Sequence, residues 1–539
     1  MTRMDAPSGQ ETVRPAFEPA DLAKAVSRCQ RRFRFVLCSA TLLMMGLSWP
    51  LWVETGAFPR VPFVLGLPEF TGPASWLAFG LLLLAVSAAA VGIAWRGMLV
   101  ASMVMLFVLI LQDQHRFQPW VYQYAMTALA LATLGRVRSL GFARLFLIAL
   151  YCHSGLSKLD ASFARGLGST FLETAARLVR VDTEHWPQES RLAAIVVMPA
   201  CEIAIAVGLC FHTTRRMALA GVVVLHLALL AILGPWGLRQ SAIVLIWNAA
   251  LVLEDLLLFG SIALPADPVP EADSRWAVMT RWAFGLGVLM PLGERCGIWD
   301  SWPSFALYAS HVERTDVLVH ESDLDILPSA IRRHALVAGP SPWRKLDLTG
   351  WSRDVRGVPV YPQARACLGV AEALAKRYPL AHLLQVTQWS RADRWSGHRR
   401  RVECWGFSAI ARQGDRYHLN AHPAPWPLRR AQDARKLGFN RSKDSPTELF
   451  WTVKIGSAEN QARTEGKTRC GFQERAESCF IPHRCQAVSV SATWARRPMR
   501  SSNSSRRQAS GGGRSCRSGQ RATATHRINL TRRSRAIRS

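Results

Sequence analysis

The sequence predicts a mainly α-helical membrane protein, in which a multi-pass bundle of eight or nine transmembrane helices precedes a small soluble α+β module and a disordered basic tail. Three observations lead to this prediction. The 539 residues are 49% hydrophobic and only 19% charged, whereas soluble proteins carry roughly 25% charged residues. The apolar residues are concentrated between positions 35 and 297. Beyond them the chain becomes polar, and its end is strongly basic.

Nine apolar windows of the first half have the composition of membrane spans. A helix needs roughly 20 apolar residues to cross the hydrocarbon core. The windows cover residues 35–53, 76–95, 97–111, 120–134, 142–157, 192–211, 217–233, 242–259 and 276–293, of which the last is the weakest. One short window is compatible with a buried helix of a soluble protein, but nine in series are not. Their uniform apolarity also excludes barrel strands, which alternate.

Basic residues of the loops predict the orientation, because Lys and Arg of short loops favour the cytoplasmic side. Alternate loops carry Arg28, Arg31, Arg32, Arg34, Arg96, Arg136, Arg138, Arg144, Arg215, Arg216, Arg275 and Arg281. We therefore expect a cell-membrane protein with a cytoplasmic N-terminus and the lipid bilayer as its surroundings, although the opposite loops also carry basic residues. With nine spans the soluble module faces outward, and with eight it faces inward. The first 34 residues are polar, so we expect an uncleaved anchor rather than a signal peptide.

Composition divides the chain into four parts: a polar N-terminal segment (1–34), a transmembrane domain (35–297), a soluble α+β module (298–437) and a disordered tail (438–539). Within the module, residues 305–310, 315–322, 382–390 and 402–411 suggest strands. Residues 364–378 predict a helix, because their apolar side chains recur at helical spacing. Nothing in these residues indicates what the module does.

The tail has two interpretations. Residues 491–539 contain thirteen arginines and no acidic residue, a composition that cannot bury enough apolar surface to fold. Arg clusters neutralise phosphates, so one interpretation is a nucleic-acid-binding tail. The other is a disordered tail, or a reading-frame change near the end of a GC-rich gene. The loss of domain patterning after Gly438 favours the second, and we do not predict a nucleic-acid partner.

Titratable residues within spans are functional candidates, because burying them in lipid is costly. The first group surrounds the turn between the third and fourth windows and consists of Asp113, Arg116, Trp120, Tyr122 and Tyr124. In one interpretation this turn is an interfacial loop with an aromatic belt. In the other it is the mouth of a substrate-binding pocket, where Asp113 pairs with Arg116.

The second group lies at the end of the fifth window. Tyr151, Ser154 and Lys158 are spaced so that they share one helix face. A desolvated amine can lose its proton and then act as a base at neutral pH. The alternative is that Lys158 extends to the interface and is neutralised by Asp160.

Two further residues lie deep within spans. Glu202 is the most deeply placed acid, and it either stays protonated or pairs with a residue of another helix. His226 lies in the middle of the seventh window, as a hydrogen-bonded core residue or as a ligand contact. No spacing of His, Cys, Asp and Glu predicts a metal site. The motifs of nucleotide-binding loops and of serine hydrolases are missing from the sequence.

The run YCHSGLSKLD, residues 151–160, resembles the Y-x-x-A-G-L-x-K-L-D segment of the vitamin K-dependent γ-carboxylase and its bacterial relatives, which share the HTTM membrane domain. Asp113 followed by Tyr122 and Tyr124 is similar to the preceding segment of that family. The G-L-x-K-L core also occurs in DoxX-like membrane proteins. The resemblance implies that Lys158 deprotonates a quinol, as the matching lysine of the carboxylase does.

Two departures weaken the case for glutamate carboxylation. Pro119 and Trp120 stand where the carboxylase has an Asn-His pair, and residues 163–166 read FARG instead of W-x-x-G. We therefore interpret the protein as a relative of these carboxylases whose activity is unknown.

Three functions are compatible with these residues. The first is a membrane-embedded enzyme acting on a quinol or another lipid-soluble substrate, with a quinol as the only candidate cofactor. Its candidate catalytic residues are Lys158, Tyr151 and Glu202, and its candidate substrate-binding residues are Asp113, Arg116, Trp120, Tyr122, Tyr124, Ser154 and His226. The second function is a non-catalytic scaffold that displays the soluble module. The third is a small-solute transporter that uses Glu202 and His226 as a proton relay, although no internal repeat supports it.

Overall fold

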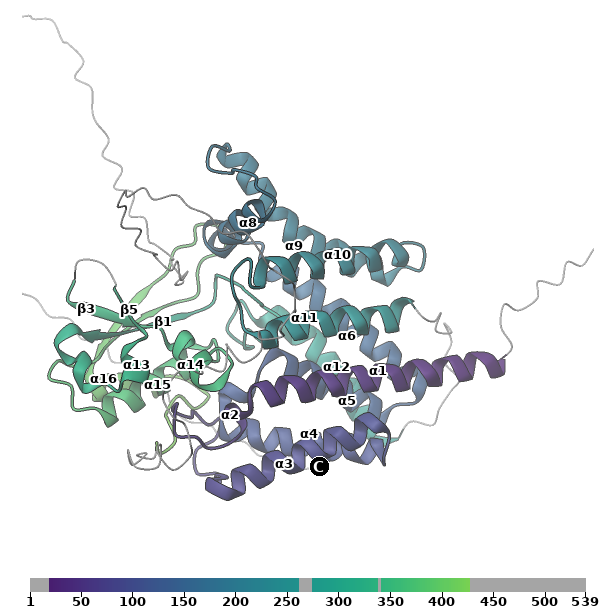
Figure 1. Ribbon diagram of the computed structural model, residues 1–539, viewed down its shortest axis with the longest axis horizontal. Helices are drawn as coiled ribbons and strands as arrows, with labels where there is room; N and C mark the ends of the chain where they lie inside the picture. The colour runs from purple at the N-terminus through teal and green to yellow at the C-terminus, as the bar shows by residue number, and fades with distance from the viewer. Residues whose placement is uncertain (1–18, 261–273, 338–340, 427–539) are drawn as a thin grey trace, which may run out of the picture. The chain divides into compact units, whose positions relative to one another are not determined.

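The computed structural model describes residues 19–260, 274–337 and 341–426, which are mainly helical (Figure 1). The long helices are α1 (Pro19–Leu47), α3 (Gly72–Val91), α4 (Trp95–Gln112), α5 (Pro119–Thr133), α6 (Arg136–Ser157), α9 (Gln188–Cys210), α10 (Arg215–Leu233), α11 (Ala242–Asp255) and α12 (Arg275–Leu289). Shorter ones are α2 (Trp49–Trp52), α7 (Ala161–Arg165) and α8 (Leu167–Leu178), with 3-10 turns at Gln114–Arg116 and Met290–Gly293. A π-helical turn, Leu256–Gly260, continues α11.

Six of these helices are long and apolar enough to cross a membrane: α3, α4, α6, α9, α10, and α11 with its π-helical turn. They coincide with six of the nine predicted windows. The other three windows fall on α1, α5 and α12. Helices α5 and α12 have only 15 residues each, and α1 begins at Pro19, so residues 19–34 of the predicted N-terminal segment join the first window in one helix. The count of nine spans therefore stays a prediction.

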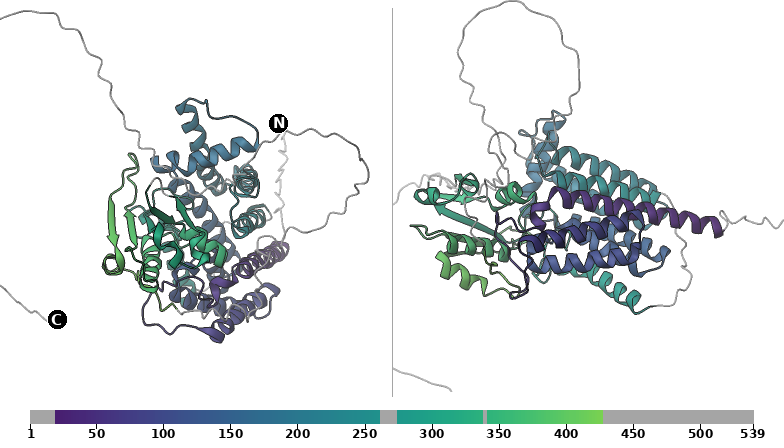
Figure 2. Two further views of the ribbon diagram at one scale, coloured as in Figure 1. Left: turned by 60° about the vertical axis from the view of Figure 1, so that its left-hand side comes forward. Right: turned by 60° about the horizontal axis from the view of Figure 1, so that its bottom comes forward.

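The arginine-rich ends of several helices meet at one end of the bundle. Gln30 of α1 donates to the Ser139 hydroxyl of α6 at 3.0 Å, and Arg96 of α4 donates to the carbonyl of Leu134 after α5 at 3.2 Å. The Arg34 guanidinium lies over the Trp95 ring at 4.9 Å. The loops at the opposite helix ends contact the module instead (Figure 2). The bundle therefore has a basic end and a module end.

The module contains a five-stranded antiparallel sheet with strand order β2-β3-β1-β4-β5. Its strands are β1 (Arg314–His320), β2 (Ala335–Val337), β3 (Trp343–Leu346), β4 (Gln385–Trp389) and β5 (Arg401–Trp405), and its helices are α13 (Ser329–Arg332), α14 (Leu348–Arg356), α15 (Ala364–Arg377) and α16 (Gly406–Gly414), with a 3-10 turn at Glu321–Ile326. Helix α15 packs on β1 and β4, so that its apolar face and the sheet enclose one core. The module is thus a small α+β unit, as predicted.

Several details of the module differ from prediction. Strands at 315–322 and 382–390 and the helix at 364–378 are confirmed by β1, β4 and α15. The expected strand at 305–310 is wrong, because Phe305 and Tyr308 adopt positive φ angles. The Phe305 ring is buried instead against Tyr122 and Phe146 of the bundle, with centroids 5.8 and 5.2 Å away.

The last predicted strand, 402–411, turns into α16 after residue 405 because Gly406, at φ 73°, redirects the chain. Strands β2 and β3 were not predicted. The predicted disordered tail, 438–539, lies outside the described residues.

Candidate functional site

Lys158 ends α6 inside the protein rather than at its surface. Its side chain is only 1% exposed, and its ammonium group donates to both carboxylate oxygens of Glu202, at 2.8 and 3.1 Å. The same ammonium group donates to the Ser154 hydroxyl at 2.6 Å and to the Ser154 carbonyl at 2.9 Å. A lysine has three protons to donate, so each of them has an acceptor here.

The close approach of α6 and α9 that forms this ion pair depends on Gly155. A Cβ atom at Gly155 would lie 2.8 Å from the Pro199 carbonyl oxygen, 2.7 Å from Ile203 Cγ1 and 3.2 Å from Glu202 Cβ. Any side chain would therefore push α9 away. The small residue next to Ser154 is what allows Glu202 to reach Lys158.

The neighbouring acid, Asp160, has other partners. It caps α7 by accepting the Phe163 N–H at 2.7 Å, and it accepts a bond from His311 at 2.9 Å. The interpretation in which Lys158 extends to the interface and Asp160 neutralises it is therefore wrong. Asp160 begins a new helix and its side chain turns to the module, whereas the Lys158 side chain turns back along α6.

Tyr151, two helical turns before Lys158, belongs to a second buried cluster. Its hydroxyl donates to the Asp255 carboxylate at 2.6 Å and lies 2.7 Å from His226 Nε2. His226 Nδ1 lies 2.9 Å from the side-chain oxygen of Asn248. The structure thus joins Tyr151 to His226 and Lys158 to Glu202. The two residues of the transporter hypothesis, Glu202 and His226, lie in different clusters.

Two adjacent acids of this region were not singled out from the sequence. Glu254 accepts a bond from Gln123 at 2.6 Å, and Gln123 in turn accepts from the Trp247 indole at 2.5 Å. Glu254 and Asp255 are both buried at the point where α11 becomes a π-helix, a rare form that is frequent at functional sites. The signal that could have found them is two consecutive carboxylates inside an apolar window.

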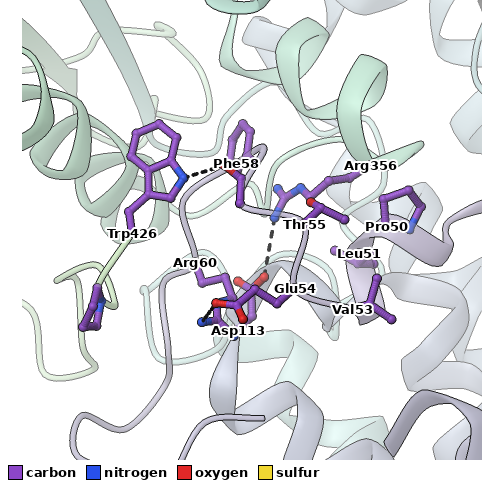
Figure 3. A pocket seen from close by; sticks show the side chains of 12 residues that line it. Pro50, Leu51, Val53, Glu54, Thr55, Phe58, Arg60, Asp113, Arg356 and Trp426 are labelled. Atoms are coloured by element: carbon purple, nitrogen blue, oxygen red, sulfur yellow. Dashed lines mark hydrogen bonds and ion pairs between the residues drawn. The ribbon is translucent and has the colours of Figure 1, made fainter. Parts of the chain in front are cut away.

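The residues of the first sequence cluster do not assemble into a pocket mouth. Asp113 lies 3.5 Å from Arg356 of α14, whereas Arg116 donates to the backbone carbonyls of Leu51, Leu109 and Trp52. Asp113 and Arg356 line a cavity of about 20 Å³ (Figure 3), which holds roughly one water molecule. The predicted Asp113–Arg116 pair is replaced by a contact to the module, because the sequence could not show that Arg356 arrives there.

The three aromatic residues after this turn are buried and have separate neighbours. Trp120 packs edge-on to Trp52 at 6.0 Å, and Tyr122 packs edge-on to Phe117 at 5.7 Å. The Tyr124 hydroxyl bonds to Ser102 at 2.7 Å. These rings fill the bundle interior, so they form neither an interfacial belt nor the wall of one cavity.

His115, between Asp113 and Arg116, is a neutral buried histidine. Its Nδ1 accepts the backbone N–H of Tyr361 from the module at 3.1 Å. Burial and the charge of Arg356 lower the pKa of His115 to about 3. This histidine therefore connects bundle and module without changing charge at physiological pH.

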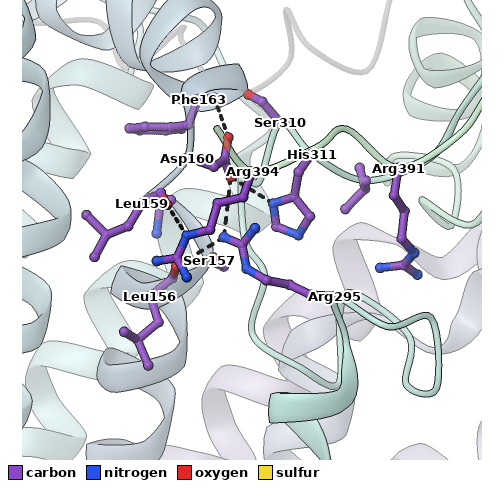
Figure 4. A network of polar contacts seen from close by, with 12 residues as sticks. Leu156, Ser157, Leu159, Asp160, Phe163, Arg295, Ser310, His311, Arg391 and Arg394 are labelled. Carbon is purple, nitrogen blue, oxygen red and sulfur yellow. Dashed lines mark hydrogen bonds and ion pairs between the residues drawn. The ribbon is translucent and has the colours of Figure 1, made fainter. Parts of the chain in front are cut away.

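A third cluster links the end of α6 to the module (Figure 4). His311 lies between two carboxylates, 2.9 Å from Asp160 and 2.8 Å from Glu294, and Arg391 donates to Glu294 at 2.6 Å. Burial by itself lowers the pKa of His311, but the bonds to Asp160 and Glu294 outweigh it and raise the pKa. Burial also opposes ionisation of the two acids, yet their bonds to His311 lower the pKa of each. Because both ring nitrogens face acceptors, His311 is a buried imidazolium.

This cluster predicts a pH-dependent stability. The contribution of His311 to the free energy of unfolding is complete below the ordinary imidazole pKa of about 6.5 and is lost as pH rises through the raised pKa. The contribution of the carboxylates is complete above about pH 4 and is lost as pH falls through their lowered pKa values. We expect His311→Gln to flatten the decline of the melting temperature that sets in above about pH 6.5, measured in detergent. His185→Gln, in an exposed loop, is the control, and parallel curves for wild type and His311→Gln would contradict the prediction.

An apolar groove of about 980 Å³ runs along α8, α9 and α10. Met198, Cys201 and Ile205 of α9 and Leu225 and Leu229 of α10 form part of its wall. Among the described residues that line it, Thr214 has the only side-chain oxygen or nitrogen atom. Its size is that of a site for a small molecule. Glu202 follows Cys201 and is turned about 100° around the helix axis, toward α6.

Comparisons with protein-family models, with curated proteins and with solved structures found no match to this chain. Within residues 19–260, 274–337 and 341–426, no group of three or more His, Cys, Asp or Glu side chains is placed to hold a metal ion. The geometry of the clusters is therefore the basis on which a function is proposed.

Proposed function

We propose that this protein is a membrane-embedded enzyme acting on a quinol or another lipid-soluble substrate, with Lys158 as the base and Glu202 as its proton partner. The observation that carries the proposal is the buried ion pair between Lys158 and Glu202, with Ser154 as a third member. Ionisable groups placed where water is scarce are costly and are retained chiefly for function. The pair joins the end of α6 to α9, two of the six helices with the composition of membrane spans.

The pair can supply a base without an outside acceptor. If one proton moves from Lys158 to Glu202, a neutral amine and a neutral acid remain, and two buried charges disappear at once. The amine then has the lone pair that a general base requires. A quinol hydroxyl that reaches it loses its proton to the amine, and Ser154 holds the lysine in place.

The groove along α8, α9 and α10 supports a lipid-soluble substrate. Its apolar wall passes beside the α9 residues that flank Glu202. Pro199 lies inside α9, and a proline removes one helical hydrogen bond and weakens the helix locally. In this proposal a substrate enters the groove from lipid and approaches Lys158 where α9 is weakened.

The proposal also includes the orientation of the protein in the membrane and its relation to the HTTM-domain family. The gathering of arginines at one end of the bundle supports a cytoplasmic basic end, with nine crossings of the cell membrane and an outward-facing module. The similarity of residues 151–160 to the HTTM-domain carboxylases supports Lys158 as base. Trp120 and residues 163–166 argue against glutamate carboxylation as the reaction.

The test is quinol oxidation by purified protein in lipid nanodiscs, under air, with reduced ubiquinone or reduced menaquinone as probe. We expect turnover by wild type and a loss of roughly 10²–10⁴-fold in the double variant Lys158→Met/Glu202→Met. That variant removes both charges together, so its fold is preserved. Full activity in the double variant would assign the pair a structural role. A wild-type protein that neither binds nor oxidises either quinol would refute the proposal.

A scaffold is the second candidate, and one observation favours it. The Trp343 and Trp405 rings pack edge-on at 5.4 Å. Leu383 lies close to Gly406, the residue after Trp405, and is 61% exposed. An exposed apolar patch of this kind is typical of a protein interface. If the protein is a scaffold, Trp405→Ser abolishes its cellular role while Lys158→Met/Glu202→Met preserves it.

A further inference from the structure

The cluster around Tyr151 contains a hydrogen-bond chain whose protons can be assigned from geometry. The chain runs from Asp255 through the Tyr151 hydroxyl to His226 and ends at Asn248. All four residues are buried, with Asp255 0% and His226 3% exposed. The residues come from α6, α10 and α11, so three helices meet at this chain.

Asn248 determines the proton on one side of the histidine ring. Its amide nitrogen donates to the Val244 carbonyl at 2.8 Å, which turns its oxygen toward His226 Nδ1. An amide oxygen only accepts hydrogen bonds. His226 Nδ1 must therefore carry a proton, whatever happens at Nε2.

On the other side of the ring, the protons of Asp255, Tyr151 and His226 Nε2 can be arranged in two ways. In the first, Asp255 is a carboxylate that accepts from Tyr151, and His226 Nε2 donates to the tyrosine oxygen, so the ring is an imidazolium. In the second, Asp255 is a neutral acid that donates to the tyrosine oxygen, and Tyr151 donates to a neutral His226. Both satisfy every bond of the chain, and they contain the same number of protons.

We infer that Asp255, Tyr151 and His226 form a proton relay inside the helical bundle. The proton on Asp255 moves to the tyrosine oxygen while the tyrosine proton moves to His226 Nε2. One O–H bond of the acid breaks and one N–H bond of the ring forms, with the tyrosine unchanged at the end. The net result is the transfer of one proton from Asp255 to His226.

The surroundings of Asp255 favour the second arrangement, in which Asp255 carries the proton. The second oxygen of Asp255 has no hydrogen-bond partner within the part of the chain that the structure describes, which disfavours the carboxylate. The hydrogen-bond chain begins and ends on α11, where Asp255 and Asn248 are seven residues and therefore about 10 Å apart along the helix axis.

The relay is independent of the proposed reaction at Lys158, which shares no hydrogen bond with it among the described residues. The test of the relay therefore measures the protonation states of His226 and Asp255 rather than enzyme turnover. Protein with ¹⁵N-labelled histidine in nanodiscs gives the charge of His226 by NMR, with His226→Gln used to assign its signal. Infrared spectroscopy gives the protonated acid, identified as the carbonyl band lost in Asp255→Asn.

We expect that the two populations change together in wild type as pH and temperature vary, each lost acid group matched by one new imidazolium. Tyr151→Phe removes the bridging oxygen and should abolish this correspondence. Tyr124→Phe, which also deletes one buried hydroxyl of the bundle, should preserve it.

Asp255→Asn provides a second variant in case Tyr151→Phe does not fold. Without an acid to supply the proton, His226 should remain neutral under conditions where wild type shows both forms. Three results would overturn the relay: independent variation of the two groups in wild type, one unchanging state throughout, or an undiminished correspondence in Tyr151→Phe.

Discussion

Replacing Lys158 by Met is expected to lower the free energy of unfolding by about 3–5 kcal/mol, because it leaves the Glu202 carboxylate buried without a counter-charge. Both side chains are almost completely buried, at 1% and 5% exposure. Glu202→Met should have a similar effect, since it leaves the ammonium group unpaired. The measurement is reversible unfolding in mixed micelles at neutral pH.

The double variant Lys158→Met/Glu202→Met should recover most of this loss, because two apolar side chains of similar volume replace the pair. Lys24→Met is the matched control. Lys24 pairs with Asp21 at 3.4 Å, but both side chains are more than half exposed, and surface pairs contribute at most about 1 kcal/mol. A single Lys158→Met variant as stable as Lys24→Met would show that the Lys158–Glu202 bond is absent in the folded protein.

Gly155→Ala is expected to destabilise the bundle by about 1–3 kcal/mol, the usual range for overpacking. The new methyl group would lie 2.8 Å from the Pro199 carbonyl oxygen and 2.7 Å from Ile203. Since the backbone of α9 cannot give way as a flexible side chain can, α6 and α9 must separate. The separation lengthens the bond between Lys158 and Glu202, so we expect the proposed reaction at Lys158 to slow as well.

Gly141→Ala on the same helix is the control for this prediction. A Cβ atom at Gly141 meets nothing within 4 Å, and alanine is favoured over glycine in helices by up to about 1 kcal/mol. The two variants, compared by thermal unfolding, should therefore change stability in opposite directions. Equal stabilisation by both substitutions would mean that α6 and α9 do not approach closely at Gly155.

Much of the fold follows from periodicity and composition. Six apolar windows became helices with the composition of membrane spans, because a segment without water must satisfy its backbone hydrogen bonds internally. The helix at 364–378 and the strands near 317 and 386 follow from local patterns of apolar residues. Residues 305–310 have the local pattern of a strand, but they do not form one, because the Phe305 ring packs into the bundle.

For the candidate site, the sequence could predict only which residues share a helix face. The spacing of Tyr151, Ser154 and Lys158 placed them on one side of α6, and Glu202 was expected either to stay neutral or to pair with another helix. Which partner each residue has was not predictable, since it depends on how α9, α10 and α11 are rotated and how closely they approach α6. The two consecutive carboxylates Glu254 and Asp255 could have been recognised as candidates from the sequence, but not that Asp255 would bond to Tyr151.

The sequence by itself determined that this chain is helical and apolar in its first half, and that a few titratable side chains lie within that half. These properties depend on residues near one another in the chain. The tertiary structure decided that Lys158 bonds to Glu202 across Gly155, that Tyr151 connects Asp255 with His226, and that Arg356 rather than Arg116 approaches Asp113. Hydrogen bonds act over about 3 Å, so only the packing of distant segments could select these partners.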